Sequence, residues 1–345
     1  MAVILLIAGA IWFIGPKFGM PVRVRGMLLV VLFTAVFFFQ LTLPSGNPIK
    51  EATGGSIANW LILVGVVGLV LAYRFGLSWL RARSVGAEET TEARPGSFSQ
   101  SELDRYARHI VLREIGGPGQ KKLKSAKVLV IGAGGLGAPS LQYLAAAGVG
   151  TIGIIDDDVV ENSNLQRQVI HTDARLGMPK VFSAKQALND QNPFVEIRPY
   201  NRRLSKEIAP DLFSDYDLVL DGSDNFDTRH LVNRTCVELG IPLVAAAITQ
   251  WEGQISLYHP ASGGPCFACV FPNIPDAELA PSCAEAGVLG ALPGVIGSMM
   301  AVEAIKWITG AGEPLTGRLL IYDALFGESR NIKALRRPDC DLCGS

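Results

Sequence analysis

Four of the six cysteines stand in two closely spaced pairs, a pattern typical of metal sites. The pairs are Cys266-Phe-Ala-Cys269 and Cys340-Asp-Leu-Cys343, and 70 residues separate them. Two such pairs that meet in space supply the four thiolates of a tetrahedral zinc site, which leaves no position open for catalysis. We therefore expect a structural zinc ion. Redox-active dithiols are the alternative, but we expect neither pair to open a helix after a strand, as thioredoxin-like motifs do.

A glycine-rich turn, IGAGGLGAPS at residues 131–140, has the composition of a phosphate-binding loop. It lies between an apolar run and a helix-like run. Glycines let the backbone approach phosphates closely, and the following helix begins with free N–H groups. Asp156 ends the next predicted strand, where dinucleotide-binding folds place the acid that binds ribose. These features favour an NAD enzyme and an ATP enzyme equally.

Polar residues after the later strands favour ATP. Asn164 and Arg167 follow the second predicted strand, and the Arg167 guanidinium has the planar fork that suits phosphate oxygens. Lys180 opens the next predicted helix and adds a second cation. Asp224 ends the fourth predicted strand, where its carboxylate can hold a Mg²⁺ ion that bridges phosphates. A lone Arg or Lys is usually a solvated surface group, so the prediction depends on their ordered appearance after successive strands.

Strand-like and helix-like segments alternate from residue 99 onward. The predicted strands are KVLVI (127–131), TIGIID (151–156), VEIRPYN (195–201), YDLVLDGSD (216–224) and PLVAAAI (242–248), and the predicted helices are 99–112, 136–147, 179–191 and 228–240. This alternation predicts an α/β domain with a Rossmann-like, doubly wound, largely parallel sheet, followed by the zinc-bound C-terminal region. We expect Ser99 or Ser101 to cap the first helix, and Cys236 to be a buried core residue.

The first 83 residues are far more apolar than the rest. The apolar segments are Ala2–Gly15, Met27–Pro44 and Ile57–Tyr73. The second and third are just long enough to cross a membrane as helices. The first could instead be a signal peptide, but no basic region precedes it and no clear cleavage site follows. Buried helices of a soluble domain would carry a polar stripe, which these lack. We expect an anchor of two to three transmembrane helices over 1–83, a polar linker over 84–98 and a domain over 99–345.

The charges of this N-terminal part predict its orientation. Residues 1–84 carry seven basic residues against one acidic residue, Glu51, whereas the whole chain has a formal net charge of −1 and gives no sign of a nucleic-acid partner. The basic residues lie after the first and third apolar segments, apart from Lys50. The positive-inside rule then places the catalytic domain in the cytoplasm, at the inner (cytoplasmic) membrane. The apolar segments contain no charged residue, so we expect an anchor and no transport path.

The motifs RYARHI, GAGGLG, DDDVVENSNLQRQ, GMPK, DGSDN, CFAC, CAEAGVLG and CDLC complete the pattern. With them the chain, over residues 99–345, resembles the MoeB/ThiF/HesA family of ubiquitin-activating-enzyme-like adenylyltransferases, most closely the molybdopterin-synthase branch. The resemblance implies an enzyme that uses ATP to adenylate the C-terminal Gly-Gly carboxylate of a ubiquitin-like sulfur-carrier protein in molybdenum cofactor biosynthesis, releasing pyrophosphate. A carrier of the thiazole (thiamine) pathway is the alternative.

Three further alternatives are less favoured. A membrane-tethered NAD-binding redox or sensor domain leaves Arg167, Lys180, Asp224 and the paired cysteines unexplained. A non-catalytic scaffold is disfavoured because every charged position of the predicted site is filled. A tRNA-modifying dehydratase of the same superfamily also adenylates its substrate, but the complete set of four cysteines argues against it.

The resemblance also implies roles for individual residues. It implies an ATP site formed by Gly132, Gly134, Gly135, Asp156, Asp158, Asn164, Arg167, Lys180, Asp224 and Asn225. The catalytic residues among these are Arg167, Lys180 and the Mg²⁺ ligand Asp224. They are joined by Arg108, whose expected place in the partner subunit's site implies a homodimer.

Three expectations concern residues outside this set. Cys283 is either a thiol that reacts with the carrier or a loop-packing residue, and we expect any persulfide sulfur to come from another protein. Residues 251–254, read as a strand edge, are expected to form a platform for the carrier. His171, in RQVIHTDARLG, is expected to hydrogen-bond a loop.

Overall fold

The computed structural model describes residues 2–44, 46–86, 97–273 and 286–344 of the 345-residue chain. The chain divides into two compact units, Met1–Glu92 and Ala93–Ser345. Cys283 and most of the predicted linker lie outside the described residues. Each unit is therefore described by itself.

The N-terminal unit is helical. Its elements are α1 Ala2–Phe13, η1 Gly15–Phe18, α2 Val22–Thr42, α3 Pro48–Ala52 and α4 Ile57–Gly86. Helix α2 and the segment Pro48–Trp79, which contains most of α4, are long and apolar enough to cross a membrane by length and composition. Helix α1, with 12 residues, is shorter than a spanning helix needs to be. The membrane anchor and its orientation therefore remain predictions.

A small polar network holds the turn between α2 and α4. Gln40, at the end of α2, donates to the Lys50 carbonyl at 3.0 Å and to the Thr53 hydroxyl at 2.9 Å. Trp60 donates its indole N–H to the Thr53 carbonyl at 2.9 Å. The Trp60 ring is buried against Val36 of α2. These hydrogen bonds join the end of α2 to the segment that leads into α4.

The C-terminal unit is built on one eight-stranded sheet. Its strands are β1 Lys127–Ile131, β2 Thr151–Asp156, β3 Glu196–Asn201, β4 Leu218–Asp221, β5 Leu243–Thr249, β6 Glu252–Tyr258, β7 Arg318–Asp323 and β8 Glu328–Lys333. The strand order is β3-β2-β1-β4-β5-β6-β7-β8. Strands β1 to β5 pair in parallel, and β6, β7 and β8 extend the sheet by antiparallel pairing. The predicted Rossmann-like, largely parallel sheet is therefore confirmed.

The reading of residues 251–254 as a strand edge is wrong. Trp251 lies in the turn between β5 and β6, and β6 begins at Glu252. Strand β6 pairs with β5 on one side and with β7 on the other. The edge of β6 that the sequence predicted to be free is paired with β7. Strand β7 begins more than 50 residues further along the chain, so the local sequence did not reveal this pairing.

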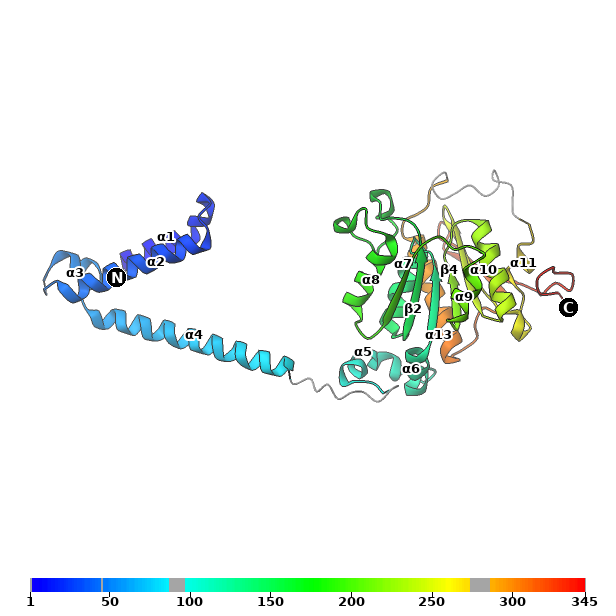
Figure 1. Ribbon diagram of the computed structural model, residues 1–345, viewed down its shortest axis with the longest axis horizontal. Coiled ribbons are helices and arrows are strands. Elements are labelled where there is room, and N and C mark those ends of the chain that lie inside the picture. Colours follow the sequence, from blue (N-terminus) through cyan, green and yellow to red (C-terminus); the bar gives the residue numbers. More distant parts are fainter. Residues whose placement is uncertain (1, 45, 87–96, 274–285, 345) are drawn as a thin grey trace. The chain divides into compact units, whose positions relative to one another are not determined.

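Helices cover both faces of this sheet (Figure 1). Among the described residues, the helices of this unit are α5 Gln100–Ile110, α6 Gly116–Ser125, α7 Gly137–Ala147, α8 Lys180–Gln191, α9 Ala209–Ser214, α10 Phe226–Leu239, α11 Phe267–Val270 and α13 Leu292–Thr309. Val128 and Val130 of β1 pack toward α7, α8 and α13, whereas Leu129 and Ile131 pack toward α9 and α10. Because both faces are buried, the central strands are continuous apolar runs without polar alternation.

A capping box begins α5. The Ser99 hydroxyl accepts the Glu102 N–H at 3.2 Å, and the Glu102 carboxylate accepts the Ser99 N–H at 2.9 Å. Lys124, at the end of α6, lies 2.6 Å from the same carboxylate. Burial by itself would raise the pKa of Glu102, but its bonds to Lys124 and Ser99 lower the pKa below its ordinary value. Ser99, and not the exposed Ser101, is therefore the cap.

We predict that Ser99→Ala lowers the midpoint of thermal unfolding of the C-terminal unit by about 2–4 °C, because loss of a helix cap costs about 1 kcal/mol. Ser101→Ala is the matched control and should leave the midpoint unchanged. Circular dichroism of the full chain measures both. Equal midpoints for the two variants would contradict the assignment of the cap.

Candidate nucleotide and metal sites

Two glycines make the turn after β1 possible. Gly132 has a backbone φ of 90°, in the region that side chains disfavour. At Gly137 a Cβ atom would lie 1.9 Å from the carbonyl oxygen of Gly132, so no larger residue fits there. The chain can therefore leave β1, reverse tightly and enter α7 with its first N–H groups at the end of the sheet. This is the strand–turn–helix context that the sequence predicted for GAGGLG.

The register of the parallel strands brings the predicted site residues to one edge. Ile131 at the end of β1 pairs with Ile155 of β2 and with Asp221 of β4. The chain therefore leaves all three strands side by side, through Gly132, Asp156 and Gly222. A Cβ atom on Gly132 would come within 3.3 Å of the Gly222 carbonyl, so the turns after β1 and β4 touch. This is the carboxyl edge at which ligands bind in such sheets.

The Asp156 carboxylate ties two loops together. Its Oδ2 accepts the Ala133 N–H at 2.7 Å, and its Oδ1 accepts the Asp158 N–H at 2.8 Å. Burial raises the pKa of Asp156, and these bonds together with the charge of Lys180 oppose that rise. Each carboxylate oxygen has two lone pairs, so both keep capacity to accept a further hydrogen bond.

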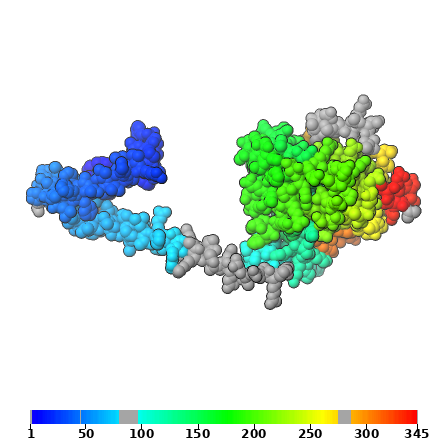
Figure 2. All heavy atoms as spheres, viewed as in Figure 1, coloured from blue at the N-terminus to red at the C-terminus, as the bar shows by residue number. Residues whose placement is uncertain are grey.

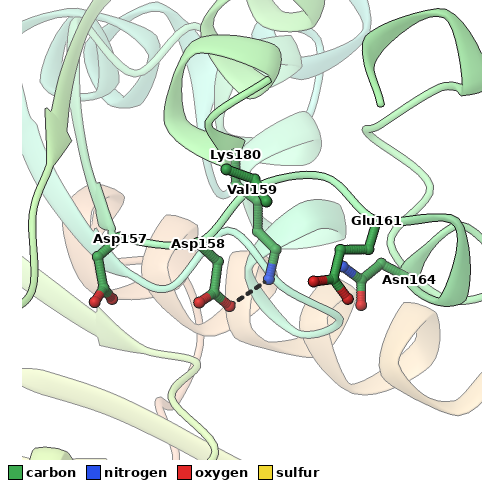
Figure 3. Close-up of a pocket in the computed structure, with 6 residues that line it drawn as sticks. All are labelled: Asp157, Asp158, Val159, Glu161, Asn164 and Lys180. Atoms are coloured by element: carbon green, nitrogen blue, oxygen red, sulfur yellow. Dashed lines mark hydrogen bonds and ion pairs between the residues drawn. The ribbon is translucent and has the colours of Figure 1, made fainter. Parts of the chain in front are cut away.

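A cavity of about 300 Å³ lies beside this edge. The residues that line it are Asp157, Asp158, Val159, Glu161, Asn164 and Lys180 (Figure 3). The Lys180 ammonium lies 2.7 Å from Asp158 Oδ2. A short bridge between Val159 and Pro179 sets this pair opposite one another, and the Lys180 N–H donates to the Asp158 carbonyl at 2.9 Å. Three predicted site residues, Asp158, Asn164 and Lys180, therefore meet in one cavity.

Arg167 lies next to the glycine turn and does not line that cavity. It follows the short helix η2 Asn162–Asn164, and its guanidinium donates to the Ser163 carbonyl at 3.0 Å. Its Cγ would be 3.9 Å from a Cβ atom on Gly135. The same Cβ atom would approach Pro293 of α13 to 3.1 Å. Gly135 is therefore confined by close packing.

Asp224 and Asn225 follow β4 on the surface. Asp224 is exposed, and its Oδ1 accepts a long hydrogen bond of 3.4 Å from the Asn225 amide. The Asn225 side chain also accepts the Thr228 N–H at 2.9 Å and so caps α10. Both residues lie at the edge of the sheet that carries the glycine turn, because Gly222, just before them, touches Gly132.

Arg108 lies elsewhere in this chain. It lines a second cavity of about 230 Å³, together with Arg105, Tyr106, His109 and Tyr143 among others. Within one chain the structure thus does not bring Arg108 to the cavity that holds Lys180. Its expected action in a partner subunit's site remains a prediction.

Sequence reasoning missed Arg229. This arginine, on the first turns of α10, is buried, and its guanidinium donates to the Ser223 carbonyl. The Ser223 N–H is held in turn by Asp221 at 2.9 Å. The turn that carries Asp224 is therefore fixed from both sides. A cation five residues after Asp224 on a predicted helix was the available signal, because such a side chain can reach back over the helix N-terminus.

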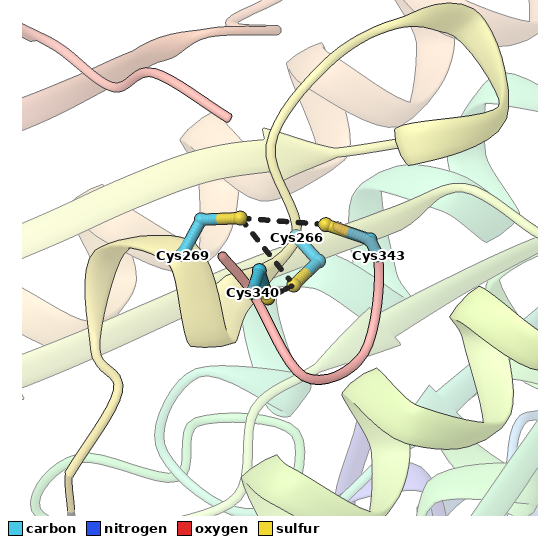
Figure 4. A group of neighbouring side chains, drawn as sticks. All are labelled: Cys266, Cys269, Cys340 and Cys343. Carbon is cyan, nitrogen blue, oxygen red and sulfur yellow. Dashed lines mark hydrogen bonds between the residues drawn. The ribbon is translucent and has the colours of Figure 1, made fainter. Parts of the chain in front are cut away.

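The four paired cysteines form one buried cluster, in which their side chains point toward one another (Figure 4). The Sγ atoms of neighbouring cysteines lie 3.4–3.8 Å apart. Zinc–sulfur bonds of about 2.3 Å in a tetrahedron require sulfur separations of about 3.8 Å, whereas a disulfide requires about 2.05 Å. The donor set therefore fits a zinc ion and excludes disulfides in this arrangement.

This cluster joins distant parts of the chain. Cys269 belongs to α11 and Cys266 immediately precedes this helix, while Cys340 and Cys343 come from the C-terminal segment, which lies in red against the yellow segment in Figure 2. The Arg337 N–H also approaches Cys269 Sγ at 3.5 Å. Cys266 caps the short helix α11, but a loop and not a strand precedes it, so this pair does not open a helix after a strand, as expected. Cys236 is buried in the core, as expected.

Comparisons with known proteins agree with this geometry. The sequence model of the ThiF family matches residues 106–342. The sulfur carrier protein adenylyltransferase of Thermus thermophilus is 49% identical over 251 residues, covering 72% of this chain and 93% of that protein. The adenylyltransferase and sulfurtransferase MOCS3 of Bos taurus is 52% identical over 249 residues, covering 72% of this chain and 54% of that protein. This chain therefore spans about half the length of the bovine relative.

A solved structure shows the same fold. The Escherichia coli protein MccB, crystallised with MccA-N7isoASN, superposes with a TM-score of 0.62 at 23% identity, over 70% of this chain and 75% of MccB. At that identity the likeness supports the fold alone. The family match spans more than half of this chain, and relatives near half identical cover most of the same residues. The chain belongs to the ThiF family.

Proposed function

We propose that this ThiF-family adenylyltransferase transfers AMP from ATP to the C-terminal Gly-Gly carboxylate of a ubiquitin-like sulfur-carrier protein. The observation that carries the proposal is the meeting of the glycine turn, the Asp156 carboxylate and the Lys180 ammonium at one edge of the sheet. The relative of Thermus thermophilus is named for activity on a sulfur carrier. The sequence motifs favour a carrier of molybdenum cofactor biosynthesis.

The reaction joins two anions, so its main requirement is positive charge. A carboxylate oxygen of the carrier attacks the α-phosphorus of ATP, and a C–O–P linkage forms. The bond from the α-phosphorus to its bridging oxygen breaks, and pyrophosphate leaves with the electron pair. No general base is needed, because a carboxylate is ionised near neutral pH. Positioning and electrostatic stabilisation therefore carry the catalysis.

Lys180 and Arg167 are proposed to supply this charge. Lys180 is buried, and its ammonium is paired with the exposed Asp158. A phosphate can compete with Asp158 for this ammonium, because a buried cation gains strongly from an anionic partner. The Arg167 side chain lies next to Gly135 of the glycine turn. The Asp156 oxygens keep lone pairs for the ribose hydroxyls.

Asp224 is proposed as the protein ligand of Mg²⁺. Its exposed carboxylate follows the turn that touches Gly132, and Arg229 with Asp221 keeps that turn fixed. Mg²⁺ is commonly bound by one or two carboxylates plus substrate phosphates, so one protein ligand is a sufficient donor set. When bound, the ion would neutralise charge on the phosphates.

Two proposals concern assembly. We propose a homodimer in which Arg108 acts in the partner subunit's site, since Arg108 lies in a cavity separate from Lys180. We also propose that α2 and α4 anchor the enzyme in the inner membrane with its catalytic unit in the cytoplasm. Their length and apolar character, together with the basic residues that flank them, support this orientation.

We predict that Asp224→Asn reduces ATP–pyrophosphate exchange with a Gly-Gly carrier by about 100-fold or more, because a preorganised electrostatic group is lost. Arg167→Ala should have an effect of the same order. Asp227→Asn is the matched control: Asp227 is exposed on the first turn of α10, and its loss should leave exchange unchanged. Near-normal exchange by Asp224→Asn, or exchange that depends on a nicotinamide nucleotide, would contradict the proposed site.

We also predict that the purified full chain contains about one zinc ion per molecule. Cys340→Ser should reduce the zinc content and lower the thermal midpoint, because the C-terminal segment loses its tie to α11. Cys236→Ala, which changes a buried cysteine outside the cluster, should keep the zinc. Elemental analysis measures the metal. A folded wild-type chain without zinc would refute the assignment.

A further inference from the structure

His171 is a buried histidine whose two ring nitrogens both have partners. It is 4% exposed. Its Nε2 lies 3.0 Å from the Ala133 carbonyl oxygen, and its Nδ1 lies 2.8 Å from the Ser183 hydroxyl. A carbonyl can only accept, so Nε2 carries the proton and donates to Ala133. In the neutral ring Nδ1 then accepts the Ser183 O–H.

Ala133 is consequently held from both sides. Its carbonyl accepts from His171, and its N–H donates to Asp156 Oδ2 at 2.7 Å. Ala133 itself is completely buried. It is the second residue of the glycine turn, so these two side chains determine how the backbone enters Gly134 and Gly135.

The peptide bond between Ala133 and Gly134 links the His171 contact to the orientation of the Gly134 N–H. The Ala133 carbonyl and the Gly134 N–H belong to one planar trans peptide, so they point in opposite directions. Because the carbonyl points to His171 in the interior, the Gly134 N–H points away from it. This N–H has no hydrogen-bond acceptor among the described residues. It is thus available to an anion at the helix N-terminus.

His171 also belongs to the segment that carries Arg167. The His171 N–H donates to the Gln168 carbonyl at 3.0 Å, and the Arg167 N–H donates to the Asn164 carbonyl at 3.1 Å. The imidazole therefore joins the arginine-bearing segment to the glycine turn, and through Ser183 it joins both to α8, which begins with Lys180.

We propose that His171 is a positioning residue of the nucleotide site, which holds the Ala133 carbonyl so that the Gly134 N–H faces the phosphates of ATP. The inference rests on the proposed function, in that ATP is taken as the ligand of the glycine turn. His171 touches neither ATP nor the reacting atoms in this role. It acts through the backbone of Ala133.

The surroundings of His171 keep its ring neutral. Burial lowers the pKa of His171 to about 4, the charges of Lys180 and Arg175 lower it as well, and the bond to Ala133 opposes the change. Arg175 faces the same serine: its guanidinium donates to the Ser183 carbonyl at 2.5 Å and lies 3.3 Å from the hydroxyl. Two cations and the lack of solvent thus disfavour the imidazolium.

This pKa has a consequence for stability. An unfolded chain takes up a proton on His171 near its ordinary pKa of about 6.5, whereas the folded chain does so only near 4. Stability is therefore present above the unfolded pKa and is lost as the pH falls through this window. We predict that the thermal midpoint falls less between pH 7 and pH 4.5 in His171→Gln than in the wild type. Equal falls would contradict a neutral His171.

The central test compares two variants of His171 in the full chain. His171→Leu removes the imidazole and its N–H donor. We expect the Kd for ATP to rise about tenfold, which corresponds to the loss of one modest interaction. In His171→Gln an amide N–H can still donate to the Ala133 carbonyl, and we expect a Kd within about threefold of the wild type. Calorimetric titration with ATP–Mg²⁺ measures both.

His259 provides the matched control. Its Nδ1 lies 2.9 Å from the Ser262 hydroxyl and its Nε2 lies 3.1 Å from the Gly240 carbonyl, which is the same bonding pattern away from the glycine turn. We expect His259→Leu to leave the Kd for ATP unchanged. An equal rise in His259→Leu, or a wild-type Kd in His171→Leu, would overturn the inference. So would a His171→Gln variant that binds as poorly as His171→Leu.

Exchange assays separate this inference from the proposed function. If the wild type binds ATP and the His171 variants rank as expected, but no carrier supports pyrophosphate exchange, the proposed acyl transfer fails while the role of His171 stands. If exchange is normal and His171→Leu keeps the wild-type Kd and KM for ATP, the role of His171 fails while the function stands. Wild-type protein that binds no ATP would overturn both.

Discussion

The parallel pairing of β1 with β2 on one side and β4 on the other is the constraint on which the nucleotide site depends. In parallel strands with this register the chain leaves every strand at the same edge, so residues separated by about 90 positions become neighbours. Gly132 can then touch Gly222, and Asp156 can reach the backbone of the turn after β1. A shift of β2 by one residue would turn Asp156 to the other face of the sheet.

Strand pairing brings the loops at this edge close together, and side-chain interactions then fix their positions. Asp156 and His171 both form hydrogen bonds with the Ala133 backbone. Asp221 and Arg229 both form hydrogen bonds with the Ser223 backbone. Asp158 forms an ion pair with Lys180. Most of these groups are buried, where an unpaired polar group is costly, so each has a strong reason to keep its partner. The result is a preorganised edge at which backbone N–H groups and cations need little rearrangement to meet phosphates.

The cysteine cluster connects distant segments of the C-terminal unit, whereas the N-terminal helices expose apolar side chains. The cluster joins α11 to the C-terminal segment, and α11 is tied to α10 by the hydrogen bond from the Phe267 N–H to Asn233 at 2.8 Å. Helix α10 begins directly after Asp224 and Asn225, so it connects the cysteine cluster to the edge of the sheet that carries the glycine turn. The N-terminal helices expose apolar side chains over most of their length, which a lipid environment accommodates.

The sequence by itself determined the alternating strands and helices, the glycine turn and the pairing of the cysteines, because these depend on local periodicity and short spacing. It also named Asp156, Asn164 and Lys180, which follow strands or open helices. Only the tertiary structure decided that β6 is internal, that Ser99 is the cap and that Arg108 lies apart from Lys180. It also decided that Arg229 holds the Ser223 turn and that the loop bound by His171 is the glycine turn. These outcomes depend on contacts between segments far apart in the chain, and local patterns carry no information about such contacts.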